Sequence, residues 1–110
     1  MNTELNNRAE LADLIENEQA VLAYFYSNNC APCVSLRPKV EELIKNSFPK
    51  LKLVFVNSEK HPEITGSYGV FSNPTLIVFL EAREYRRGSK YISITQLEQE
   101  INRPYQLLFN

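Results

Sequence analysis

The chain alternates between short apolar runs and longer stretches in which apolar residues recur every three or four positions. Apolar runs bounded by turn-forming residues are typical of buried strands, and they predict strands over residues 21–26, 51–56 and 76–80. The helical spacing predicts amphipathic helices over about residues 6–17, from the cysteines to about residue 46, and 93–103. A strand, a helix and a second strand in this order predict a parallel pair of strands with a right-handed crossover.

Smaller features complete the pattern in the second half of the chain. The polar segment 59–68 predicts one or two helical turns, and Glu81-Ala82 predicts a tight turn. Residues 83–87 then return as an antiparallel edge strand, which their charges protect from further pairing. Ser93 with Gln96 forms a capping-box pattern that predicts the start of the last helix. Pro104 is predicted to end this helix, because proline disrupts a helix interior. We expect the apolar tail of residues 105–109 to fold back onto the core.

Composition limits the number of domains and the classes of partner, but it does not indicate a function. A chain of 110 residues has the size of one domain, so we expect a single domain over residues 1–110. The net charge of -1 does not indicate a nucleic-acid or membrane partner, and no apolar run is long enough to span a membrane. Because the N-terminal residues lack a basic and apolar signal sequence, we expect a cytoplasmic location, where thiols are kept reduced.

The candidate chemistry lies at Cys30 and Cys33, the only two cysteines of the chain. They follow the predicted strand 21–26 and its turn, and Pro32 between them suits the first turn of a helix. A helix N-terminus favours an anion, and the thiolate is the nucleophilic form of cysteine. A C-x-x-C sequence near a βαβ pattern therefore predicts a redox-active dithiol.

Three other interpretations of the cysteines remain open. A zinc site usually needs four ligands, whereas the dithiol and His61, the only histidine, supply three at most. A structural disulfide stabilises a protein most when it closes a long loop, and the loop between Cys30 and Cys33 is minimal. Two inert, buried cysteines are disfavoured by the turn residues before Cys30 and by the proline. We therefore expect no metal and no organic cofactor, with His61 a solvated residue.

Taken together, these features resemble the thioredoxin family. The resemblance rests on four motifs and covers residues 21–103: Cys30-Ala31-Pro32-Cys33 after a strand, Pro38 in the following helix, Tyr68-Gly69-Val70, and Asn73-Pro74-Thr75 opening a strand. It implies a three-layer α/β/α sandwich with a central mixed sheet, which we expect to have about four strands because the N-terminal segment leaves little room for another. Residues 51–56 would then form an open edge, so the protein is expected to be a monomer or a weak dimer.

The resemblance also implies an activity, that of a thiol–disulfide oxidoreductase. Cys30 would attack a protein disulfide, Cys33 would resolve the mixed disulfide, and a reductase that the sequence does not name would recycle the dithiol. The Asn73–Pro74 bond would be cis and would lie beside the dithiol, although the residues alone favour an ordinary trans bond. The motif and substrate-contact residues would be Asn29, Ala31, Pro32, Asn73 and Pro74. The alternative is an adaptor module of the same fold that is redox-inactive or senses thiols.

The sequence departs from the family's usual pattern around the dithiol. Asn29 replaces a tryptophan, and Ala31 replaces a glycine. Tyr24 occupies the place of a buried aspartate, and Phe55 that of a lysine. A buried carboxylate has a raised pKa and can accept the proton of the resolving thiol. Its replacement by Tyr24 predicts slower turnover.

Overall fold

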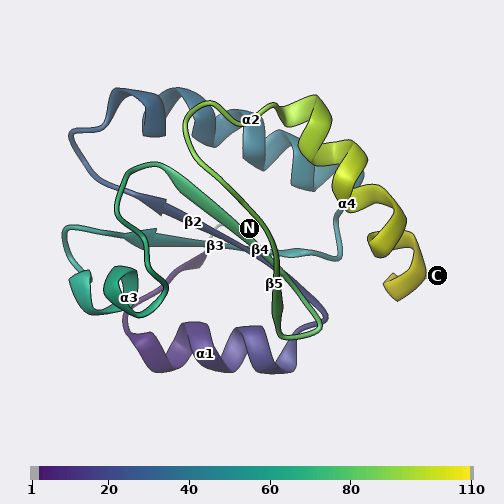
Figure 1. Ribbon diagram of the computed structural model, residues 1–110, viewed down its shortest axis with the longest axis horizontal. Coiled ribbons are helices and arrows are strands. Elements are labelled where there is room, and N and C mark those ends of the chain that lie inside the picture. The colour runs from purple at the N-terminus through teal and green to yellow at the C-terminus, as the bar shows by residue number, and fades with distance from the viewer. Residues whose placement is uncertain (1–2, 110) are drawn as a thin grey trace.

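The computed structural model describes residues 3–109 and forms a three-layer α/β/α sandwich (Figure 1). Helices α2 and α4 cover one face of a central mixed sheet, and α1 and α3 cover the other. The strands are β1 (Thr3–Glu4), β2 (Ala20–Tyr26), β3 (Lys52–Asn57), β4 (Thr75–Leu80) and β5 (Arg83–Gly88). The helices are α1 (Arg8–Asn17), α2 (Ala31–Ser47), α3 (Pro62–Ser67) and α4 (Ile94–Phe109).

The strand order in the sheet is β1-β3-β2-β4-β5. The predicted parallel pairing of β2 with β3 is confirmed, with α2 as the crossover, and β4 is antiparallel to both β2 and β5. The charged strand β5 lies at one edge, as predicted. Because β2 and β3 end at the edge where β4 begins, the loops that follow β2 and β3 meet the loop that precedes β4.

The two faces of the sheet carry separate hydrophobic cores, since successive side chains of a strand point to opposite faces. In β2, Leu22 and Tyr24 belong to the core under α2 and α4, whereas Ala23 and Phe25 belong to the core over α1 and α3. The same alternation occurs in β3 and β4. Helix α2, which carries Cys33, packs against the first of these cores through its buried side chains Leu36, Val40, Leu43 and Ile44.

The prediction of a four-stranded sheet with residues 51–56 at an open edge is wrong. The segment before α1 forms β1, which pairs in parallel with β3 at Val54 and Phe55. The Leu5 N–H donates to the carbonyl oxygen of Phe55 at 2.9 Å, and the Leu5 side chain is buried. A strand of two residues shows no apolar run, so the sequence pattern missed it. The edge of β3 that we expected to invite dimerisation is partly covered within the chain.

The prediction that Pro104 ends the last helix is also wrong, because α4 continues through it to Phe109. Proline lacks the N–H that would donate to the carbonyl four residues earlier, here that of Glu100. The hydroxyl of Tyr85, on β5, donates to this carbonyl oxygen at 2.9 Å and replaces the missing donor. The predicted apolar tail is therefore helical, with Tyr105 buried and Leu107 exposed.

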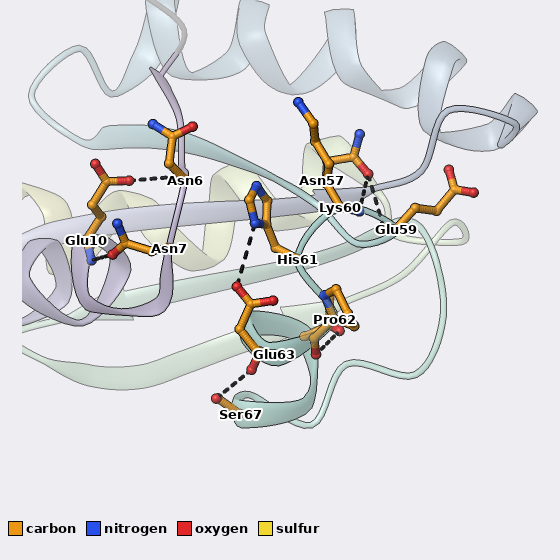
Figure 2. A network of polar contacts seen from close by, with 11 residues as sticks. Asn6, Asn7, Glu10, Asn57, Glu59, Lys60, His61, Pro62, Glu63 and Ser67 are labelled. Carbon is orange, nitrogen blue, oxygen red and sulfur yellow. Dashed lines mark hydrogen bonds and ion pairs between the residues drawn. The ribbon is translucent and has the colours of Figure 1, made fainter.

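Polar side chains fix the starts of two helices. The side chain of Asn7 accepts a hydrogen bond from the Glu10 N–H, while the Glu10 carboxylate accepts one from the Asn6 N–H (Figure 2). This reciprocal arrangement satisfies donors that a helix N-terminus leaves unpaired. Ser93 caps α4 as predicted, accepting a hydrogen bond of 3.2 Å from the Gln96 N–H.

Candidate active site

Cys30 and Cys33 form a disulfide at the N-terminus of α2. Cys30 is the N-cap residue, and its sulfur accepts a hydrogen bond from the Cys33 N–H at 3.2 Å. Cys30 is partly exposed, whereas Cys33 is 3% exposed. Once reduced, the Cys30 sulfur would occupy the position where helix N–H groups stabilise a negative charge.

The loop before β4 lies against the dithiol. The Asn73–Pro74 bond is cis, as the resemblance implies, and Pro74 is buried. The Cys30 sulfur lies 3.5 Å from the carbonyl oxygen of Asn73. The loop of residues 68–74, which contains Pro74, is called the proline loop below. The structure brings this loop beside the cysteines, although Cys33 and Asn73 are 40 residues apart in the sequence.

The remaining predicted site residues border the same surface. Asn29 and Ala31 are exposed and Pro32 is partly exposed, so all three are accessible beside the disulfide. Two apolar side chains that the sequence reasoning did not single out are also exposed here: Val34, directly after Cys33, and Phe71, in the loop before β4. The exposed fraction is 68% for Val34 and 94% for Phe71.

A polar network that the sequence reasoning missed joins the loops that follow β2 and β3 to the loop that precedes β4. The Ser58 hydroxyl donates to the Asn73 side-chain oxygen at 2.7 Å, and the Glu59 carboxylate accepts from the Asn28 N–H at 3.0 Å. The side-chain oxygen of Asn57 accepts from the N–H groups of Glu59 and Lys60, forming the tight turn after β3 (Figure 2). The signal in the sequence was the position of these residues directly after β2 and β3.

Arg87 is a second residue that the sequence reasoning missed, and its side chain binds the backbone at the start of the proline loop. Its guanidinium donates to the carbonyl oxygens of Tyr68 at 2.8 Å and Gly69 at 3.0 Å. It also pairs with the Glu84 carboxylate at 2.9 Å, and this hydrogen bonding holds the pKa of Glu84 below its usual value. Gly69 adopts a left-handed φ of 64°, which favours glycine at this turn.

Tyr24 occupies the buried position expected for an acid and is fully inaccessible to solvent. Its hydroxyl donates to the carbonyl oxygen of Cys33 at 2.6 Å. Burial raises the pKa of Tyr24 to about 12, and the nearby Arg37 opposes this shift only in part. The hydroxyl therefore stays protonated at neutral pH and acts as a hydrogen-bond donor, not as a base.

His61 is partly exposed at the start of α3, with its Nδ1 3.6 Å from the Glu63 carboxylate (Figure 2). Among residues 3–109, no three His, Cys, Asp or Glu side chains are grouped so that they could hold a metal ion. None of the helices formed by these residues combines the length and apolar character needed to cross a membrane.

A C-x-x-C disulfide at a helix N-terminus, in an α/β sandwich with a cis proline beside it, defines a thiol–disulfide oxidoreductase. A family model described as Thioredoxin matches residues 2–103, and the chain belongs to the thioredoxin family.

Individual relatives agree with this assignment. The chain is 27% identical over 105 residues to the thioredoxin-like protein YdfQ of Bacillus subtilis, an alignment that covers 96% of this chain and 93% of that protein. It is 30% identical to a thioredoxin of Alicyclobacillus acidocaldarius, in an alignment that covers 84% of this chain and 89% of that protein. The crystal structure of Fasciola hepatica thioredoxin superposes with a TM-score of 0.80 at 30% identity, covering 92% of this chain and 97% of that one.

Proposed function

We propose that this protein reduces disulfides of other proteins, with Cys30 as the nucleophile and Cys33 as the resolving thiol. One observation carries the proposal: the two cysteines of the dithiol differ in accessibility. The Cys30 sulfur lies at the N-cap of α2 beside the exposed surface, whereas Cys33 is buried beneath it. A substrate disulfide can therefore reach Cys30 first.

The electron balance of the reaction follows from thiol–disulfide exchange. The Cys30 thiolate attacks one sulfur of the substrate disulfide, forming a mixed disulfide and releasing the other substrate sulfur as a thiolate. Cys33 loses its proton and attacks the Cys30 sulfur, which breaks the mixed disulfide and releases the second substrate thiolate. Two electrons pass to the substrate, its thiolates take up protons from solvent, and the Cys30–Cys33 disulfide forms. A reductase would return two electrons to this disulfide.

The substrate would lie across the surface formed by Asn29, Ala31, Pro32 and the Asn73–Pro74 loop. The backbone groups of Asn73 would bind an extended segment around the substrate cysteine in the manner of an added strand. The exposed side chains of Val34, next to Cys33 in the sequence, and Phe71, two residues before Asn73, would contribute apolar contact area. The coverage of β3 by β1 supports a monomer, and the dithiol chemistry suits the cytoplasm, where such bridges are reduced again.

Reduction of insulin in the presence of dithiothreitol tests the proposal. The wild-type protein should accelerate insulin precipitation, and Cys30→Ser should abolish the acceleration. Ser35→Ala, an exposed position on α2, serves as the matched control and should retain full activity. A folded wild-type protein that gives no acceleration would favour the adaptor or sensor alternative.

A further inference from the structure

A positive charge lies one helical turn beyond the resolving cysteine. Arg37 follows Cys33 by four residues in α2, so both side chains lie on the same face of the helix. Long side chains in helices point back toward the N-terminus, over the preceding turn. The Arg37 guanidinium accordingly stacks on the Phe55 ring, 3.7 Å from its centroid, and lies 5.3 Å from that of Tyr26.

This position connects Arg37 to the interior behind the dithiol. The Phe55 ring packs edge-on against the Tyr24 ring, with centroids 5.7 Å apart, and the Tyr24 hydroxyl contacts the Cys33 carbonyl. Burial is the main cause of the raised pKa of Tyr24; the positive charge of Arg37 acts to lower this pKa, and the negative charge of Glu41 acts to raise it. Arg37 is therefore linked to the backbone of Cys33 by packing through the Phe55 and Tyr24 rings.

Two carboxylates hold the guanidinium in place from the outer side. Glu4 of β1 lies 3.4 Å from Arg37 Nη2, and Glu41 of α2 lies 3.6 Å from Arg37 Nε. The side chain of Glu4 is 48% exposed, and its other oxygen accepts a hydrogen bond from the Tyr26 hydroxyl. Glu41 is a further helical turn away from Cys33.

The other elements packed against α2 carry their own apolar and charged side chains. Strands β3 and β4 contribute only apolar side chains to this core, namely Leu53, Phe55, Leu76 and Val78. Helix α4 places Glu98 against Ser47, at the far end of α2. Lys39 and Lys90 line a separate hollow of about 310 Å³ with Pro32 and Ser35. Arg37 is the charged side chain of α2 that stacks on Phe55, whose ring packs against Tyr24.

We infer that Arg37 favours the thiolate of Cys33 during resolution of the mixed disulfide. It is a positioning residue that acts through its charge, and it compensates in part for the acid that Tyr24 replaces. The Cys33 proton leaves to solvent instead of to a buried carboxylate, and the bonds formed and broken are those of the exchange described above. This inference rests on the proposed function.

The direct test measures the pKa of the Cys33 thiol in the Cys30→Ser background, from thiolate absorbance near 240 nm. Arg37→Met keeps the packing on Phe55 but removes the charge, and it should raise this pKa by about one unit. Arg37→Lys should keep most of the effect. Arg37→Gln is a second neutral variant in case Arg37→Met does not fold, and Lys45→Met, near the far end of α2, is the control that should change nothing. High salt should raise the pKa in the parent protein more than in the neutral variants.

The kinetic test uses the intact dithiol. Single-turnover reduction of a model disulfide should show resolution about three- to tenfold slower in Arg37→Met at pH 7, with the rates converging at high pH, where Cys33 is ionised in both proteins. An unchanged thiol pKa and an unchanged pH profile in a folded neutral variant would overturn the inference. If the parent protein resolves no mixed disulfide at all, the proposed function fails instead, so the two failures are distinguishable.

Discussion

The hydroxyl of Tyr24 donates a hydrogen bond of 2.6 Å to the carbonyl oxygen of Cys33, linking the central strand β2 to the first turn of α2. This bond fixes the backbone of Cys33, the proposed resolving cysteine, at the position where the family resemblance implies a buried acid. The tyrosine is fully buried and stays neutral, so its contribution is structural. Two predictions test the two consequences, one for stability and one for catalysis.

Removal of the hydroxyl should cost stability in a pH-dependent way. At pH 8, Tyr24→Phe should be less stable than the wild type by about 1 kcal/mol, because the Cys33 carbonyl loses a donor. Burial raises the pKa of Tyr24 from 10.0 to about 12 in the folded protein. The stabilisation by the protonated hydroxyl is therefore complete below pH 10 and is lost as the pH rises toward 12.

Urea unfolding of the oxidised proteins at pH 8 and pH 11 measures this effect. The gap between wild type and Tyr24→Phe should shrink by about 1 kcal/mol at the higher pH. Tyr91→Phe, at an exposed position, is the control and should leave both values unchanged. A gap that stays constant between the two pH values would show that Tyr24 does not titrate as the structure indicates.

Replacement of Tyr24 by an acid should change the rate of resolution. Tyr24→Asp should speed the resolving step near neutral pH, because a buried carboxylate can accept the Cys33 proton. The variant should also lose about 3 kcal/mol of stability through the cavity and the desolvated acid. Stopped-flow reduction of a model disulfide between pH 6 and pH 9 measures the rates. Identical pH profiles in two folded proteins would mean that proton removal from Cys33 does not limit turnover.

The hydrogen bond from Tyr85 to Glu100 should matter only while residue 104 is proline. Tyr85→Phe should cost about 0.5–1 kcal/mol in the wild type, because the Glu100 carbonyl loses its donor. In Pro104→Ala the alanine N–H can donate to the same carbonyl, and Tyr85→Phe should then cost much less. Denaturant unfolding of the four proteins gives the coupling energy. A coupling of zero would contradict this explanation of how α4 tolerates the proline.

The turn between β4 and β5 carries removable backbone strain. Glu81 and Ala82 both have a left-handed φ, of 50° and 67°, which non-glycine residues adopt at a cost. Ala82→Gly should therefore stabilise the protein by about 0.5–1 kcal/mol. Ala12→Gly, at an exposed helical position in α1, should instead destabilise it by about 1 kcal/mol. Thermal unfolding of both variants checks the opposite signs, and a loss of stability in Ala82→Gly would be evidence against strain at this turn.

The sequence was sufficient for the features that depend on strong local patterns. The buried runs of β2, β3 and β4 and the capping residue Ser93 follow from hydrophobic spacing and turn chemistry, as does the start of α2 at the dithiol. The positions of Cys30 and Pro74 beside each other required the family resemblance, because local pattern does not place a loop against a helix 40 residues away.

The missed features depend on contacts between distant residues. Strand β1 is defined by its pairing with Val54 and Phe55, and the continuation of α4 past Pro104 depends on a hydroxyl from β5. The same holds for Arg37, whose guanidinium stacks on a strand residue 18 positions later. Propensity and spacing describe what a segment favours alone, whereas these elements are decided by a partner elsewhere in the chain.

The most direct test of the account is to trap the mixed disulfide. Reduced Cys33→Ser and reduced Cys30→Ser are each mixed with an excess of a disulfide-containing protein such as insulin, and the products are analysed by mass spectrometry without reductant. The account predicts that Cys33→Ser accumulates a covalent adduct through Cys30, while Cys30→Ser forms little or none. An adduct that forms equally well, or better, through Cys33 in Cys30→Ser would contradict the assignment of Cys30 as the nucleophile.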